Sequence, residues 1–420
     1  MQSLSALFLA LSATSLLASA EPVRIGLNYP KTGPYATQGL DQLQAAELAR
    51  DELNAAGGIL GRQIEFAVRD TQSKPPVATE NARELIDKEK VAMIFGGSSS
   101  GVAVAVGNVC QQAGVPFFGT LTYSADTTGK DGQRFTFREC YDSYAGAQAL
   151  GDYMKKQFAG KTFFYVTADY NWGHTTEAAF RKVTGTEDVA RHGGIKTTFP
   201  GATPEVFKKA ITLAKLKKPD VLVLVEFGKD MEYAVREANA QGLKATSQLV
   251  VPNLTLGMAE DAGPENMEGV LGALPWSWNV PYQFDFAGGK RFVEAFAAKY
   301  NRYPCTSGAS AYTILYEYKA AVERAGSFEG AKVVKALEGH TYTQLKDAQT
   351  WRAFDHQSLQ TVYAVRCKPA AEVKKGKFGQ DYFEILASMT GEQAFITEPD
   401  WKKARAAAGK PEQLQPLPGE

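Results

Sequence analysis

The sequence has little cysteine or histidine, and neither sign of charge is in excess. Its 420 residues include four Cys and four His, and 46 Lys plus Arg balance 46 Asp plus Glu. Nucleic acid and anionic membranes select for basic surfaces, so this balance argues against either as the main partner. The chain contains no CxxC pair and its histidines are scattered, so we predict no metal site and no cofactor.

Long apolar runs are also scarce, and the main one stands at the start of the chain. Residues 7–17 are mostly apolar, and Ala18-Ser19-Ala20 is a small-residue cleavage site. We therefore expect a signal peptide, 1–20, that is cleaved after Ala20. The segment lacks a Lys or Arg near its start, and a buried helix is the alternative interpretation. No later stretch approaches the ~20 apolar residues that cross a bilayer.

Export would place the four cysteines in an oxidising compartment. In an oxidising compartment an even number of cysteines favours disulfides. The sequence does not decide the pairing among Cys110, Cys140, Cys305 and Cys367. We favour a bridge between Cys110 and Cys140, which are the closest pair in sequence.

Strand-like and helix-like segments alternate along most of the chain. A first series has strand candidates at 23–29, 63–69, 91–95 and 115–118, separated by helix candidates at 39–56, 77–88 and 102–113. A second series has helix candidates at 143–157, 175–183, 204–216 and 231–240, with strand candidates at 162–167, 195–199, 221–227 and 248–251. Short apolar strands between helices indicate parallel sheets that are covered on both faces.

After residue 269 the pattern is less regular, with helix candidates followed by two late strand candidates. This remainder suggests that the chain returns to complete both units. The predicted fold class is therefore α/β, with two doubly wound parallel-sheet lobes joined by a hinge. We assign the N-terminal lobe to 21–139 and 276–345, the C-terminal lobe to 140–275 and 346–398, and a solvated tail to 399–420. Ligands of open α/β sheets bind beside the carboxyl ends of the strands, which here face a cleft between the lobes.

Two polar loops follow neighbouring strands of the first series. The serine loop, Gly96–Gly101, contains Ser99 and Ser100 at the start of a helix, where N–H groups and hydroxyls suit a carboxylate or another anion. An ordinary serine N-cap is the alternative interpretation. The second loop, 119–124, brings Thr122 and Tyr123 to the same edge of the sheet. We therefore expect the two loops to offer donors and acceptors to one spot.

The serine loop also permits an enzyme. Residues 97–101 match G-x-S-x-G, the nucleophile elbow of α/β-hydrolases, with Ser99 as the nucleophile. Asp355-His356 lies far downstream and could supply the base. It fits the Ser…Asp…His order of these enzymes poorly. No HGGG-type oxyanion loop precedes the serine. We therefore predict no catalytic residue, and a serine hydrolase is the alternative of a different class.

The second series places aromatic side chains at strand ends. Trp172 lies in the loop 169–173 and Phe227 ends another strand, where such rings can form the wall of a pocket. Satellite packing is the alternative interpretation for each of them. Glu226 and Asn253 are further candidates, because a carboxylate at Glu226 can meet a ligand ammonium. A glutamate at a strand end is, however, usually just solvated.

The sequence resembles the type I periplasmic solute-binding proteins of branched-chain amino-acid (Leu/Ile/Val) ABC importers. The resemblance combines the apolar leader, the two series of alternating strands and helices, and the loops described above. The resemblance runs from about Val23 to Ala387. It is carried by an ordered set of segments: Val23-Arg24-Ile25-Gly26, Thr32-Gly33-Pro34, the helix end Asp51–Gly61, the serine loop, Ala113-Gly114-Val115-Pro116, Tyr170–Gly173 and Glu237–Gly242.

The resemblance implies a periplasmic, monomeric two-lobed clamp without catalysis. It implies that the clamp binds an amino acid or a similar small carboxylate and delivers it to a membrane permease driven by ATPase subunits. By positional match, Ser100, or its neighbour Ser99, corresponds to the carboxylate-binding serine. Thr122 falls where a backbone carbonyl meets the ligand amine, and Tyr123 falls at the neighbouring hydroxyl position.

The sequence departs from this family at the second half of the site. Trp172 and Phe227 stand where the family usually has tyrosines. Asn253 falls near a position where amino-acid binders usually carry an acidic residue, and this weakens the case for an α-ammonium group unless Glu226 replaces that acid. Aromatic acids or amides are therefore the alternative ligands. The sequence leaves open the ligand's identity and whether Glu226 or Asn253 meets a ligand amine.

Overall fold

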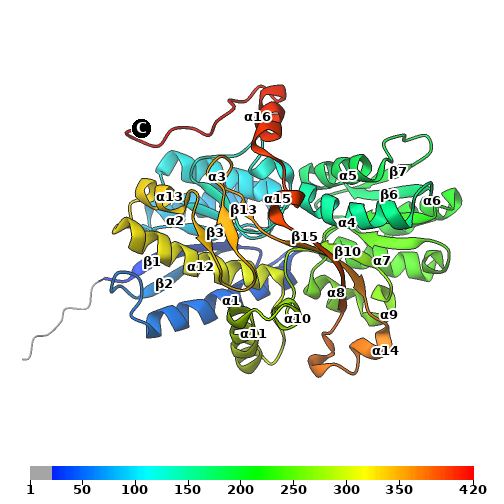
Figure 1. Ribbon diagram of the computed structural model, residues 1–420, viewed down its shortest axis with the longest axis horizontal. Coiled ribbons are helices and arrows are strands. Elements are labelled where there is room, and N and C mark those ends of the chain that lie inside the picture. The colour runs from blue at the N-terminus through cyan, green and yellow to red at the C-terminus, as the bar shows by residue number, and fades with distance from the viewer. Residues whose placement is uncertain (1–20) are drawn as a thin grey trace, which may run out of the picture.

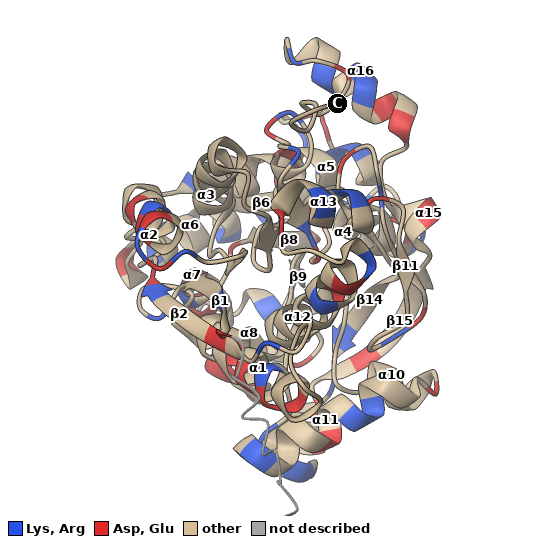
Figure 2. Cartoon of the chain, turned by 90° about the vertical axis from the view of Figure 1, so that its left-hand side faces the viewer, with Lys and Arg blue, Asp and Glu red and all other residues tan. Residues whose placement is uncertain are grey.

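The computed structural model describes residues 21–420, which form two α/β lobes (Figure 1). The predicted signal peptide lies outside the described residues. Within residues 21–420, no helix has both the length and the apolar character needed to cross a membrane. On the side of the molecule that Figure 2 shows, basic and acidic residues are interspersed over the helices.

The N-terminal lobe is built on a five-stranded parallel sheet of order β2-β1-β3-β4-β5. Its strands are β1 (Val23–Tyr29), β2 (Ile64–Asp70), β3 (Ile94–Gly96), β4 (Phe117–Gly119) and β5 (Thr136–Arg138). Its helices are α1 (Ala36–Ala55), α2 (Pro75–Asp87), α3 (Ser100–Ala113), α11 (Ala287–Tyr300), α12 (Thr306–Ala325) and α13 (Gly330–Leu337). Helix α1 packs on α12 and α2 packs on α3, and two separate apolar clusters cover the sheet, as a doubly wound fold requires.

The C-terminal lobe is built on a seven-stranded sheet of order β15-β14-β10-β9-β8-β6-β7. Its strands are β6 (Phe163–Ala168), β7 (Gly194–Thr197), β8 (Val221–Val225), β9 (Gln248–Val251), β10 (Leu271–Leu274), β14 (Val362–Cys367) and β15 (Phe383–Met389). The larger helices are α4 (Ser143–Gln157), α5 (Asn171–Thr184), α6 (Pro204–Lys217), α7 (Lys229–Ala240) and α8 (Leu256–Ala262). Strand β14 runs antiparallel to β10 and β15, so this sheet is parallel except at one edge.

Short elements complete the fold. They are η1 (Ala125–Thr127), η2 (Leu243–Ala245), η3 (Lys377–Gly379), α9 (Pro264–Met267), α10 (Val280–Gln283), α14 (Ala370–Val373), α15 (Gly391–Ala394), α16 (Glu398–Ala407) and the antiparallel strands β11 (Thr341–Tyr342), β12 (Gln349–Trp351) and β13 (Ser358–Leu359). A bridge between Arg138 and Gln357 joins this small sheet to the end of β5. We had expected the chain to return to the C-terminal lobe at residue 346. It joins the C-terminal sheet only at β14, which begins at Val362.

The segments that pass between the lobes are tied together by buried polar side chains. The Lys346 ammonium donates to the carbonyl oxygens of Pro275 and Thr361, at 2.7 and 2.6 Å. The Gln360 amide donates to the carbonyl of Glu139. These bonds connect the passages after β5, after β10 and before β14, so they form the polar part of the hinge.

The segment 399–420 differs from the expected solvated tail. Most of its residues are exposed, but the side chains of Trp401, Arg405 and Leu417 are buried. The Trp401 indole N–H donates to the carbonyl of Thr128 at 2.8 Å. Figure 1 shows α16 and the C-terminus lying over the N-terminal lobe. The low apolar content of the segment concealed these few anchoring side chains.

The expected bridge between Cys110 and Cys140 is absent. All four cysteines are buried and unpaired. Cys110 packs in the apolar cluster between α2 and α3, whereas Cys140 belongs to the core of the other lobe, where its thiol contacts the Gly119 and Thr122 carbonyls. Proximity in sequence does not bring these thiols together, because α3 and the segment after β5 carry them into different cores.

Candidate functional site

The two polar loops of the N-terminal lobe meet at the carboxyl ends of β3 and β4. The Ser99 hydroxyl accepts a hydrogen bond from the Val102 N–H at 3.4 Å and caps α3. The Ser100 hydroxyl accepts from the Ser124 N–H at 3.0 Å. Ser99 therefore acts as an N-cap, while Ser100 joins the serine loop to the loop 119–124. Both side chains are buried.

Arg138 holds the loop 119–124 from behind. Its buried guanidinium donates to the carbonyl oxygens of Thr122 (3.2 Å) and Ser124, and to the Thr128 hydroxyl (2.7 Å). It also forms a 3.0 Å ion pair with Asp142, which caps α4. The Thr122 hydroxyl bonds to the Thr127 hydroxyl at 2.6 Å. The loop is thereby held in one conformation by side chains that the sequence analysis did not single out.

Phe227 brings the aromatic candidates of the two lobes together. Its ring centroid lies 5.6 Å from that of Tyr123 in the N-terminal lobe and 5.9 Å from that of Trp172 in the C-terminal lobe. All three side chains are buried, and neither the Tyr123 hydroxyl nor the Trp172 indole N–H has a hydrogen-bond partner. A continuous path of contacts thus runs from Ser100 through the Ser124 backbone, Tyr123 and Phe227 to Trp172.

Tyr35, Tyr170 and Phe199 complete a closed circuit of rings, and of these three the sequence analysis named only Tyr170, in the segment Tyr170–Gly173. The circuit runs Tyr35–Phe227–Trp172–Tyr170–Phe199 and back to Tyr35, with successive centroid separations of 5.3, 5.9, 5.8, 4.0 and 5.9 Å. We call these five residues the aromatic cluster. Tyr35 comes from the N-terminal lobe and the other four from the C-terminal lobe. Tyr35 directly follows the Thr32-Gly33-Pro34 segment, which was the available sign of its role.

The two remaining candidates are buried in the C-terminal lobe. Glu226 is 0% exposed, and one carboxyl oxygen accepts from the Thr197 hydroxyl at 2.5 Å while the other has no partner. Burial raises the pKa of Glu226 well above its usual range. Its interpretation as a solvated strand-end residue is therefore wrong. The Asn253 amide donates to the Tyr141 hydroxyl at 2.9 Å, and its amide oxygen has no partner.

Helix α1 contributes two glutamines that the sequence analysis missed. Gln38 and Gln42 lie one helical turn apart and are both buried. The Gln42 amide oxygen accepts from the Thr120 hydroxyl at 2.6 Å, in the second polar loop. Both polar atoms of the Gln38 amide lack a partner. The available sign in the sequence was the spacing of the two glutamines, which puts both on one face of the helix. Their burial, and the other lobe that this helix faces, are visible only in the structure.

The two lobes touch directly where residues 228–229 meet Pro34. The Lys229 N–H donates to the carbonyl of Pro34 at 3.1 Å. Gly228 has a φ of +61°, and a Cβ there would lie 2.5 Å from the Pro34 carbonyl oxygen. Position 228 thus requires glycine for both its backbone conformation and this approach. The two lobes are therefore in direct contact at this point.

The hydrolase alternative has no assembled machinery. Within residues 21–420, no histidine is hydrogen-bonded to Ser99. The His356 ring instead pairs with Glu338 at 2.9 Å and stacks on Phe137 at 4.1 Å. The Ser99 hydroxyl is used as a cap, as described above. A nucleophile needs a base within hydrogen-bond reach, and the described residues do not provide one.

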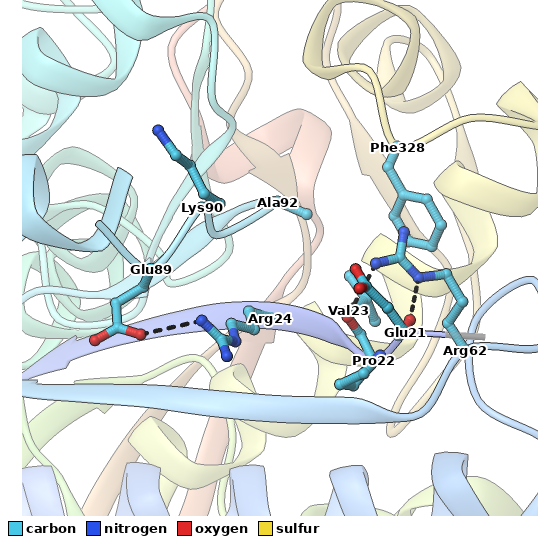
Figure 3. A pocket seen from close by; sticks show the side chains of 9 residues that line it. All are labelled: Glu21, Pro22, Val23, Arg24, Arg62, Glu89, Lys90, Ala92 and Phe328. Carbon is cyan, nitrogen blue, oxygen red and sulfur yellow. Dashed lines mark hydrogen bonds and ion pairs between the residues drawn. The ribbon is translucent and has the colours of Figure 1, made fainter. Parts of the chain in front are cut away.

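A surface cavity of about 610 Å³ lies elsewhere, near the start of β1 (Figure 3). Two of its three basic side chains are engaged: Arg24 pairs with Glu89 at 3.4 Å, and Arg62 donates to the carbonyl oxygens of Glu21 and Pro22. The Arg62 guanidinium also lies over the Phe328 ring. This cavity is at the amino ends of the strands, opposite the edge where such sheets bind ligands.

The fold is that of a two-lobed α/β protein, and its polar and aromatic loops meet where the two lobes contact each other. The family described as Periplasmic binding protein matches residues 22–377. The chain therefore belongs to this family, a family of solute-binding proteins.

Relatives agree with this assignment over most of the chain. The Leu/Ile/Val-binding protein homolog 7 of Brucella suis biovar 1 (strain 1330) is 29% identical over 348 residues, which is 78% of this chain and 85% of the relative. A periplasmic binding protein from Burkholderia mallei has a TM-score of 0.80 at 25% identity, covering 90% of this chain and 97% of that one. An amino acid ABC transporter substrate-binding protein from Pseudomonas fluorescens Pf-5 has a TM-score of 0.78 at 26% identity, covering 89% and 96%.

Proposed function

We propose that the chain is the extracytoplasmic solute-binding component of an ABC importer and binds an amino acid or a similar small carboxylate between its lobes. The path of contacts from Ser100 to Trp172 carries this proposal, because it joins both lobes at the carboxyl ends of their strands. The similarity to a Leu/Ile/Val-binding protein homolog and to an amino acid ABC transporter substrate-binding protein supports it.

Buried polar atoms without partners support a ligand position between the lobes. The Tyr123 hydroxyl, the Asn253 amide oxygen and the second carboxyl oxygen of Glu226 are all buried and unpaired. An unsatisfied buried polar group costs about 1–3 kcal/mol, so a ligand that satisfies several of them gains affinity. The hydroxyls of Ser99 and Ser100 and the α3 N-terminus face the carboxylate. Thr122 lies beside them in the second loop, and Trp172 and Phe227 form the apolar wall.

The mechanism is closure of one lobe on the other. The solute docks on the loops of the N-terminal lobe, and the C-terminal lobe then brings Trp172 and Phe227 against it. A ligand that contacts both lobes only in the closed form shifts the population towards that form. The chain is exported with cleavage after Ala20, acts in the periplasm as a monomer without catalysis, and delivers its solute to a permease driven by ATPase subunits.

The aromatic cluster supports a second candidate of the same class. Five rings around one site favour a ligand with a ring of its own, because aromatic pairs add about 0.5–1.5 kcal/mol beyond the area that they bury. An aromatic acid or amide is therefore the alternative solute.

A thermal-shift screen followed by calorimetry tests the proposal. A solute that binds only the folded protein raises its unfolding temperature. We expect an amino acid, an aromatic acid or an amide to raise it and to bind with a stoichiometry of about one and no turnover. Ser100→Ala is expected to weaken that binding. An ester substrate that is hydrolysed by the wild type but not by Ser99→Ala would instead establish the hydrolase alternative.

A further inference from the structure

The C-terminal segment makes a fourth connection between the lobes, in addition to the three passages of the hinge. After β15 the chain forms α15, which packs against α4 of the C-terminal lobe, and it then crosses to the N-terminal lobe. In Figure 1, α15 lies between the two lobes, whereas α16 and the C-terminus lie over the N-terminal lobe. The segment therefore has one end on each lobe.

The first end is fixed in the C-terminal lobe. Ala394 and Phe395 are buried in the same hydrophobic core as strands β14 and β15. The carbonyl of the next residue, Ile396, accepts a hydrogen bond at 2.7 Å from Arg352, which directly follows β12 in the small sheet joined to β5. The chain thus passes from one lobe to the other at Phe395 and Ile396.

The second end is fixed on the N-terminal lobe by four side chains. Two of them donate to backbone carbonyls that follow the loop 119–124, one is buried in the core of the lobe, and one forms ion pairs. They are Trp401 (to Thr128, 2.8 Å), Arg405 (to Gly129), Leu417, and Glu420 (with Arg134 at 3.2 Å and with Lys335). The segment from α16 onwards is therefore docked along its length on the N-terminal lobe.

Very little chain separates the two fixed ends. Only Ile396 and Thr397 lie between Phe395 and the start of α16. An extended chain spans about 3.5 Å per residue, so this stretch reaches about 10 Å at most. A larger separation of the lobes at this point must either unwind the first turn of α16 or detach the helix from its carbonyl partners.

We propose that residues 396–420 form a strap that restrains the lobes from separating. This inference rests on the proposed function, whose mechanism requires lobes that move apart and together. The strap makes its contacts while the lobes touch, so these contacts stabilise that arrangement and lower the population in which the lobes are apart. The strap acts without contacting the solute, and it controls how readily the solute reaches the site.

A lengthened strap tests the restraint and keeps the contacts at both ends. About ten Gly and Ser residues inserted between Ile396 and Thr397 form a flexible linker that removes the limit on length. We call this the slack variant. The matched control carries the same insertion between Glu187 and Asp188, in an exposed loop that joins α5 to β7 within the C-terminal lobe.

Pulsed electron paramagnetic resonance on the protein without solute measures the separation of the lobes. Spin labels are attached at Lys74→Cys and Glu205→Cys, two exposed positions that follow β2 in one lobe and β7 in the other, while the native cysteines are buried. The ratio of separated to touching lobes is expected to rise about tenfold in the slack variant, because opening no longer breaks the hydrogen bonds of Trp401 and Arg405. The control insertion should give the distances of the protein without an insertion.

The double variant Trp401→Phe/Arg405→Ala gives a second test that does not depend on an insertion. It removes the two bonds to the carbonyls of Thr128 and Gly129, so the distances should shift in the same direction. Unchanged distances in the slack variant or in the double variant overturn the inference, and so does an equal shift in both insertions.

The solute screen decides the proposed function separately, because the distances are measured without solute. A shift in the slack variant supports the strap even if no compound of the screen binds, and that failure then counts against the proposed function alone. Binding of a solute together with unchanged distances overturns the strap, while the proposed function stands.

Discussion

The phenolic oxygens of Tyr35 and Tyr170 lie 3.0 Å apart and join the two lobes directly. Tyr35 precedes α1 in the N-terminal lobe, and Tyr170 precedes α5 in the C-terminal lobe. This hydrogen bond exists only while the lobes are closed. It therefore belongs to the free energy of closure, and not to the stability of either lobe.

Tyr35→Phe tests this hydrogen bond because it keeps the ring contacts and removes the hydroxyl. We expect the closed form to lose about 1 kcal/mol, so ligand affinity falls roughly fivefold while the unfolding temperature of the free protein changes little. Calorimetry on Tyr35→Phe, Tyr170→Phe and the double variant measures the effect. Since the two hydroxyls form one bond, the double variant should be no weaker than either single variant. Additive losses would contradict the direct bond.

Ser100→Ala and Ser99→Ala separate ligand binding from helix capping. Ser100→Ala removes the acceptor of the Ser124 N–H and, if the proposed function is correct, a hydrogen bond to a charged ligand, so we expect a loss of about 1.5–3 kcal/mol in binding. Ser99→Ala removes the cap of α3 and is expected to cost about 1 kcal/mol of folding stability. Thr397→Ala, which removes the cap of α16, is the matched control for the stability effect. Equal binding by Ser100→Ala and the wild type would exclude Ser100 from the site.

The pH dependence of stability reports on Asp230, a buried carboxyl group on α7. Burial raises the pKa of Asp230 to about 7, so between about pH 4 and pH 7 the native state retains a proton that the unfolded state has lost. The free energy of unfolding therefore falls as pH rises through this window, by up to about 4 kcal/mol. Asp230→Asn lacks this contribution, so its stability relative to the wild type should increase from pH 4 to pH 7. Urea unfolding of both proteins across the window gives the difference, and a constant difference would refute the burial of an ionisable group.

The alternation of strands and helices was accessible from the sequence because its signals are local. Apolar strands such as Val221–Val225 and glycines after helices, such as Gly114, act within a few residues. The position of the serine loop followed from a general property of parallel sheets. The family and the two-lobed fold were therefore predicted correctly.

The aromatic cluster was not accessible in the same way. Tyr35, Tyr170 and Phe199 come from loops whose positions depend on how the lobes close, and no local pattern reveals that. Glu226 seemed solvated because a strand end usually is, whereas here it faces Thr197 on β7. Whether two cysteines could form a disulfide likewise depended on which hydrophobic core each one packs into, and the sequence does not show this.

The cysteines provide a test of the core assignments. Burial raises the pKa of all four thiols, so the native protein should react slowly with a thiol reagent such as Ellman's reagent. In denaturing guanidinium chloride without reductant, all four thiols should react. A reductant should leave the unfolding temperature unchanged. Fewer reactive thiols in the denatured protein would show that a disulfide forms after all.

The C-terminal segment supports the loop 119–124 through Trp401. The Trp401 indole holds the Thr128 carbonyl, and the Thr128 hydroxyl in turn binds Arg138, which fixes the loop 119–124. Trp401→Phe should cost about 1 kcal/mol of stability through the lost hydrogen bond, and Trp401→Ala about 3–5 kcal/mol through the cavity as well. Hydrogen exchange should become faster in residues 119–128 of Trp401→Ala. Trp278→Ala removes a partly buried indole that stacks on Tyr303 and should leave exchange in that loop unchanged, so acceleration in both variants would indicate general destabilisation instead.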